Sequence, residues 1–185
     1  NCANLMQYYE RPKNSDLNQM FEALERFMSC VNTVAEFRVL GGDPFMNKDL
    51  HLVVDKLNKF EQVKKIAIYT NAKIVPKGPN LKCLKHDKVT VDITNYGDLS
   101  SKHDEIIKVL EDNNIAYSTI LTTTWQDSGT ILPFQNRTLE ENKKVFMGCC
   151  NKDVISLLHG KLYRCPFSAN ADNLKAIPED KSDFV

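Results

Sequence analysis

The chain alternates short apolar runs with longer amphipathic segments at nearly even spacing. Strand-like runs are centred near residues 39, 68, 91 and 119 of the 185-residue sequence, and each interval leaves room for one helix with its loops. The apolar spacing predicts strands over 36–40, 65–70, 88–94 and 115–122, and helices over 17–28, 47–60, 79–85 and 100–114. This repeated strand–helix order predicts an α/β fold with parallel strands.

The balanced charge of the chain argues against two classes of binding partner, nucleic acids and anionic membranes. The sequence has 24 Lys and Arg residues against 24 Asp and Glu residues, a formal net charge of +0 at pH 7. Such a chain has no electrostatic field that would draw it to nucleic acid or to an anionic membrane. It also has no run of about 18 apolar residues and no secretory leader pattern. We expect a cytoplasmic protein that binds small molecules or proteins, with no nucleic acid and no membrane as partner.

The residues that follow the predicted strands are the candidate ligand contacts, because parallel α/β folds bind ligands at the carboxyl ends of their strands. The first run leads into Gly41-Gly42-Asp43-Pro44. Consecutive glycines let a backbone approach a ligand closely, and Pro44 stiffens the exit from the strand. Asp43 offers a carboxylate that suits an ammonium group. Taken alone, such a turn is most often structural.

Two further strand ends carry polar residues. Thr70-Asn71 closes the second run, and Asp92 and Thr94 alternate with apolar residues in the third. The two-residue period of a strand places Asp92 and Thr94 on the same face. Because a polar inward face is costly unless it binds something, we expect Asp92 and Thr94 to contact a ligand.

The cysteines divide into two groups. All six, at positions 2, 30, 83, 149, 150 and 165, are too sparse for a disulfide scaffold, so thiols or metal ligands are expected. Cys30 and Cys83 lie in helix-like segments with apolar neighbours, which predicts small buried side chains without a functional role.

The tail combines thiols with a predicted hairpin. Cys149 and Cys150 precede a hairpin over 155–163 whose turn contains Gly160, and Cys165 follows it. A glycine turn between thiolates lets the chain double back, so that both sulfurs reach one iron–sulfur cluster. The spacing does not decide between Cys149 and Cys150, and a hairpin with incidental thiols is the alternative.

Together these motifs resemble those of radical S-adenosylmethionine (SAM) enzymes. That family has Cys-x3-Cys-x2-Cys in a cluster-binding loop, and residues 1–4 resemble the end of this loop, with Cys2 as the third cysteine. The family's Gly-Gly-Glu-Pro motif, which holds the amino group of SAM, is matched by residues 41–44 with a shorter carboxylate. Residues 69–72 resemble its Thr-Asn-Gly strand end, and residues 150–165 resemble the start of a SPASM or twitch-type extension.

The resemblance implies a fold, cofactors and a reaction. The fold would be a partial (β/α)6 TIM-like barrel over residues 1–136 with a SPASM- or twitch-like extension over 137–185. Cys2 would bind a 4Fe-4S cluster, and Cys149, Cys150 and Cys165 a second, auxiliary cluster. Reductive cleavage of SAM would give a 5′-deoxyadenosyl radical that takes hydrogen from a peptide or sugar-type substrate, with an electron from a donor such as flavodoxin or ferredoxin. The residues expected to hold SAM are Gly41, Gly42, Asp43, Pro44, Thr70, Asn71, Asp92 and Thr94.

Two departures from the family pattern lead to further expectations. The first two cluster cysteines and the first strand are absent, which predicts a fragment of a longer enzyme that is inactive by itself. No cysteine follows Cys165, so the tail holds an incomplete auxiliary ligand set. The alternative from another class is a non-catalytic α/β ligand-binding module whose cysteines are incidental or bind zinc. Zinc sites need four ligands, and the tail offers three cysteines with His159 nearby.

Overall fold

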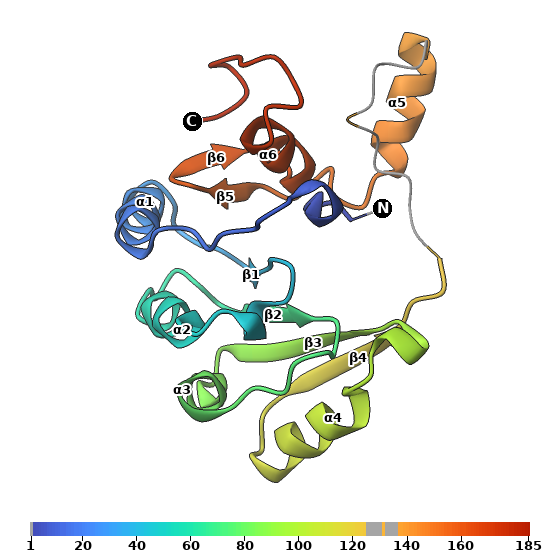
Figure 1. Cartoon of the computed structure of the whole chain (residues 1–185). Helices are drawn as coiled ribbons and strands as arrows, with labels where there is room; N and C mark the ends of the chain where they lie inside the picture. The colour runs from blue at the N-terminus through green and yellow to red at the C-terminus, as the bar shows by residue number, and fades with distance from the viewer. Residues whose placement is uncertain (1, 125–130, 132–136) are drawn as a thin grey trace. The chain divides into compact units, whose positions relative to one another are not determined.

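A parallel four-stranded sheet lies in the middle of the chain in this computed structural model, which describes residues 2–124, 131 and 137–185. Its strands, in order across the sheet, are β1 (Phe37–Val39), β2 (Ile66–Thr70), β3 (Val89–Asn95) and β4 (Tyr117–Leu121) (Figure 1). The sheet belongs to one compact unit, Leu24–Thr123. A second unit combines Asn1–Ala23 with Thr124–Val185.

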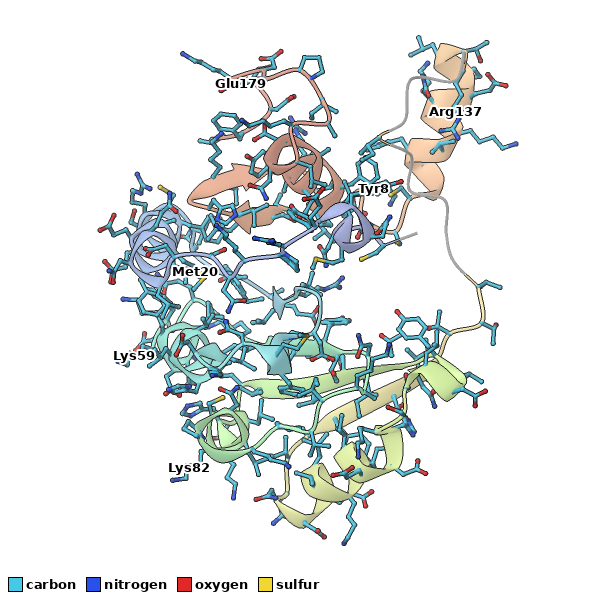
Figure 2. The ribbon with its side chains drawn as sticks, in the orientation of Figure 1. Tyr8, Met20, Lys59, Lys82, Arg137 and Glu179 are labelled. Carbon is cyan, nitrogen blue, oxygen red and sulfur yellow. The ribbon has the colours of Figure 1, made fainter. Side chains whose placement is uncertain are left out.

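Helices cover one face of this sheet. They are α2 (Leu50–Asn58), α3 (Gly78–Lys82) and α4 (His103–Asp112) (Figure 1). The position of α4 is fixed by side chains, because Tyr117 of β4 donates to Glu111 at 2.7 Å and His103 contacts Thr119 at 3.0 Å. The outer side of the helices is polar, and Figure 2 shows Lys59 and Lys82 projecting there.

The core of this unit lies between the helices and the sheet. Ile66, Ile68, Val91 and Ile93 on the covered face are at most 1% exposed. Each such side chain contributes roughly 1.5–3 kcal/mol when it is fully buried. Because successive side chains of a strand point to opposite faces, the residues between these four lie on the other face of the sheet.

Three short 3-10 helices complete the unit. They are η2 (Pro44–Met46), η3 (Cys83–Lys85) and η4 (Gly97–Leu99). Of these, η2 follows β1 and η4 follows β3, so both lie at the carboxyl edge of the parallel sheet. The predicted ligand contacts at the strand ends lie along this edge.

The second unit is built around a small antiparallel sheet. Its elements are η1 (Met6–Tyr8), the first part of α1 (Leu17–Ser29), α5 (Leu139–Gly148), β5 (Ser156–Leu158), β6 (Lys161–Tyr163) and α6 (Pro166–Asn173). The hydroxyl of Tyr9 donates to Asn170 Oδ1 at 2.8 Å and links the early segment to α6.

The hairpin of β5 and β6 closes through a two-residue turn. His159 and Gly160 both have positive φ, 47° and 78°, as a type I′ hairpin turn requires. The last residue, Val185, pairs in both directions with Leu162 at 2.9 and 3.0 Å and adds to the edge of β6. Gly160 is thus required by the turn itself.

Most of the predicted elements are confirmed. All four strands and the helices over 17–28, 47–60, 79–85 and 100–114 are present with bounds shifted by a few residues, and so is the hairpin. The predicted α/β class with parallel strands is confirmed, whereas closure into a (β/α)6 barrel and the 136/137 domain boundary stay predictions. In the parts of the chain that the structure describes, no helix is both long and apolar enough to cross a membrane.

The sequence analysis missed two helices. Thr138 and Glu141 form a capping box at the start of α5, with Thr138 N donating to Glu141 Oε2 at 2.7 Å. Pro166 occupies the first turn of α6, where its missing N–H costs nothing. Both signals are visible in the sequence, so these helices were predictable from it.

Candidate functional site

The strand end after β1 is fixed by the carboxylate of Asp43. This residue is 6% exposed, and its Oδ1 accepts from Phe45 N at 3.0 Å, which caps η2. Its Oδ2 accepts from Thr70 Oγ1 at 2.7 Å and from Asn71 N at 3.3 Å. The carboxylate therefore joins the ends of β1 and β2 and has both oxygens engaged.

The end of β2 continues this set of hydrogen bonds. Thr70 Oγ1 accepts from Ala72 N at 3.2 Å, and Ala72 has a left-handed backbone with φ of 59° while it is fully buried. Asn71 O accepts from Ser100 Oγ at 2.8 Å. Ser100 Oγ also contacts Thr94 O at 3.3 Å and accepts from Tyr96 N at 2.9 Å, so one buried serine connects the ends of β2 and β3.

Gly41 and Gly42 form the open part of this edge. Both are exposed, and a Cβ built on Gly41 would meet no atom within 4 Å. The φ of Gly41 lies outside the left-handed region that favours glycine. Nothing in the described packing therefore requires a glycine at position 41, whereas a ligand that approaches the backbone closely would.

Asp92 and Thr94 share the face of the sheet that is opposite the helices, as predicted. The register pairs Asp92 with Tyr69 and Ser118, and Thr94 with Ile120. Asp92 Oδ1 accepts from Ser118 Oγ at 2.6 Å, and its Oδ2 lies 3.7 Å from Lys65 Nζ. This face is polar and half-buried.

A charged cluster near the start of the strands continues this polar face. Glu36 accepts from Lys65 at 2.8 Å and from Arg38 at 2.6 Å, and the hydrogen bond from Lys65, followed by that from Arg38, lowers the pKa of the Glu36 carboxyl. Arg38 lies over the ring of Tyr69 at 5.5 Å. Burial raises the pKa of the Tyr69 phenol. Opposite charges neutralise each other here, so the face attracts neither anions nor cations strongly.

The predicted cluster cysteines all belong to the second unit. Cys149 Sγ accepts from Asn151 N at 3.4 Å, and Cys165 Sγ caps α6 by accepting from Ser168 N at 3.4 Å. Cys2 and Cys165 are half-buried and Cys150 is exposed. Across residues 2–124, 131 and 137–185, no three His, Cys, Asp or Glu side chains come together as a metal site. The described donor set therefore does not fit an auxiliary cluster.

The two cysteines without a predicted role differ from each other. Cys83 is buried, as expected. The prediction for Cys30 is wrong, because α1 ends at Ser29 and Cys30 follows it in an exposed turn.

Ser100 and Ala72 are the site residues that the sequence reasoning missed. Ser100 lies in a segment predicted only as a helix start, and its contacts to the second and third strand ends depend on the folded chain. A signal existed for Ala72, since it stands where the resembled Thr-Asn-Gly motif has glycine. Its positive φ explains why glycine would suit that position.

Two curated proteins that resemble this chain carry the same name. The chain is 29% identical over 113 residues to GTP 3',8-cyclase from Staphylococcus epidermidis, in strain RP62A and equally in strain ATCC 12228. The matched region covers 60% of this chain and 31% of each relative, so the chain spans about a third of their length. No protein-family model matches the sequence. This distant similarity supports a relationship with radical SAM enzymes, to which the cyclase belongs.

Proposed function

We propose that this chain carries the SAM-binding strand ends of a radical SAM enzyme. The empty space where a side chain of residue 41 would stand, beside a hydrogen-bonded carboxyl edge, is the observation that carries the proposal. The distant similarity to GTP 3',8-cyclase supports it independently.

Individual residues have distinct roles in this proposal. The backbone of Gly41 and Gly42 holds the amino group of SAM, and Pro44, buried at the start of η2, stiffens the loop behind them. Asn71, Asp92 and Thr94 contact the rest of the cofactor or the substrate. The bound cluster and SAM supply hydrogen-abstraction chemistry, while the protein positions them and excludes water.

Metal binding enters the proposal through Cys2. This thiolate is one of the three that hold the 4Fe-4S cluster in the proposed enzyme. An auxiliary cluster at Cys149, Cys150 and Cys165 would need further ligands, because the described residues bring no three ligands together. Electrons come from a small donor protein such as flavodoxin or ferredoxin.

The substrate class is open to direct tests. The relatives are named for GTP, so GTP is the first compound to test, before the peptide and sugar-type substrates that the tail motif suggests. The polar sheet face has Lys65 and Arg38 close to Glu36 and Asp92, a neutral combination of two cations and two anions that favours no strongly charged ligand by itself.

The test compares SAM binding by the unchanged chain with that by Gly41→Ala. The added methyl group meets no protein atom, so the variant should fold normally and gain about 0.4–1 kcal/mol from lower unfolded-state entropy. The methyl group should nevertheless block close approach of SAM and weaken binding at least tenfold, a loss of about 1.4 kcal/mol. Calorimetric titration and the amide shifts of Gly41 and Gly42 measure binding, and urea unfolding measures stability.

Gly148→Ala is the matched control. Gly148 also has open space around a built Cβ and no positive φ, but it lies at the end of α5 in the second unit. This variant should bind SAM like the unchanged chain. The proposal is wrong if the unchanged chain shows no response to SAM, or if Gly41→Ala binds as tightly as Gly148→Ala. A ligand-binding module without radical chemistry would bind another compound at the same edge.

A further inference from the structure

The carboxylate of Asp43 is engaged inside the chain. It accepts three hydrogen bonds, from Phe45 N, Thr70 Oγ1 and Asn71 N, at 3.0, 2.7 and 3.3 Å. The residue is 6% exposed. Three of the roughly four acceptor positions of this carboxylate are filled, and so little of the residue is exposed that a ligand ammonium group has little access to the fourth. Displacing one of the three donors instead would leave it buried without a partner, at a cost of about 1–3 kcal/mol.

The hydroxyl that holds Asp43 is on the covered side of the sheet. Thr70 is in register with Ile93, which is 1% exposed, and Thr70 itself is 3% exposed. The polar face carries the alternate residues, among them Tyr69 and Asp92. Thr70 therefore reaches Asp43 from the core side, away from the face where a ligand would lie.

The same hydroxyl also orders the loop after β2. It accepts from Ala72 N at 3.2 Å, next to the left-handed backbone of Ala72. Ala72 O in turn accepts from Lys102 N at 2.9 Å, directly before α4. Thr70 therefore connects the end of β1 to the loop after β2, and the residue directly before α4 fixes that loop.

We propose that Asp43 and Thr70 are a positioning pair that sets the backbone of Gly41 and Gly42 for SAM without contacting SAM. This inference rests on the proposed function and changes the role of the carboxylate from ligand contact to loop support. It also accounts for the shorter side chain, because an aspartate carboxylate caps its own 3-10 turn two residues on and still reaches Thr70.

The experiment is a double-mutant cycle with a conservative rescue. Thr70→Val removes the hydroxyl at nearly constant volume, and Asp43→Asn places an amide against Thr70 and Asn71 N. Each should weaken SAM binding about tenfold, since each loses a hydrogen bond to a charged acceptor. The double variant should be no weaker than Asp43→Asn alone, because both changes break the same contact. Thr70→Ser, which keeps the hydroxyl, should bind within about threefold of the unchanged chain.

Hydrogen exchange tests the pair without any ligand. In Thr70→Val the amides of Asn71 and Ala72 should exchange about tenfold faster, since their acceptors are displaced or lost. Thr90→Val is the control, because Thr90 lies at the start of β3, away from the carboxyl edge of the sheet, and should change neither exchange at these amides nor SAM binding.

The possible results separate the two proposals. If the unchanged chain does not bind SAM but Thr70→Val speeds exchange, Asp43 and Thr70 support the loop, while the proposed function fails and the role of the pair in SAM binding fails with it. If SAM binds and Thr70→Val leaves both its affinity and the exchange rates within twofold, the positioning pair is overturned while the function stands. Additive losses in the double-mutant cycle would also overturn it. Should Thr70→Val fold poorly, Thr70→Ser and Asp43→Asn give the same comparison.

Discussion

At the scale of single residues, burial decides the chemistry of Cys83. The residue is 3% exposed, and its Sγ donates to Asn80 O at 3.2 Å. Burial, with a smaller effect of the Asp55 charge, raises the pKa of the Cys83 thiol to about 12. Because the thiolate is the nucleophile, this thiol is inert near neutral pH in the native chain.

We expect a maleimide reagent at about pH 8 to label Cys30 rapidly and Cys83 only after unfolding. Mass spectrometry of the labelled peptides measures both rates, and Cys83→Ala identifies the slow site. The ordinary thiol pKa is 9.0, so the stability that Cys83 contributes is fully present below that pH and is lost as the pH rises toward about 12. Equal labelling of Cys30 and Cys83 in the native chain would contradict this assignment.

Asp43 could be predicted from the sequence as a site residue, but its hydrogen-bond partner could not. Its residue type and its place after a strand identify it as a site residue. Its hydroxyl partner, Thr70, is 27 residues away, so their contact exists only once β1 and β2 are paired. Sequence spacing therefore finds the carboxylate but not the direction in which it points.

At the scale of elements, α4 and α6 end in the same way with different residues. Each ends at a residue with a left-handed backbone, Asn114 with φ of 54° and Lys175 with φ of 54°. In both, the N–H groups of this residue and of the next one donate to carbonyls of the last helical turn. Asparagine tolerates this conformation, whereas lysine is strained in it. The end of α6 therefore stores strain that the end of α4 largely avoids.

Lys175→Gly should raise the free energy of unfolding by about 0.5–1 kcal/mol, because relief of strain exceeds the added entropy of the unfolded chain. Asn114→Gly is the comparison at the same position of another helix and should change stability by less than about 0.5 kcal/mol. Urea denaturation of both variants measures the difference. A destabilised Lys175→Gly variant, or an equal gain from Asn114→Gly, would argue against strain at position 175.

Helix ends also show what the sequence could have supplied. Asp16, a residue type typical of helix starts, caps α1 with its Oδ1 accepting from Gln19 N at 2.9 Å. The capping box of Thr138 and Glu141 is an equally local signal, so α5 was accessible to the same reasoning. The division of the chain into two compact units could not be predicted in this way. It depends on contacts such as the one between Tyr9 and Asn170, which are 161 residues apart.

At the scale of the whole molecule, regular strand spacing was enough to predict a parallel sheet. Each crossover needs a helix, and the sequence provides one between every pair of strands. Closure of the sheet into a barrel does not follow from spacing, since four strands in order fit an open sheet equally well.

The outer edge of β4 governs how the isolated protein should behave in solution. Within the described chain β4 pairs only with β3, and Ile120 and Leu121 are each 65% exposed. An edge strand that exposes two apolar residues is a template for another strand, so we expect self-association that grows with concentration. Ile120→Lys should reduce it in sedimentation velocity runs, whereas Leu52→Lys, an exposed leucine of α2, should not. Equal association of the two variants would show that the contact lies elsewhere. If only Ile120→Lys reduces association, measurements describe the monomer only at concentrations too low for this contact to form.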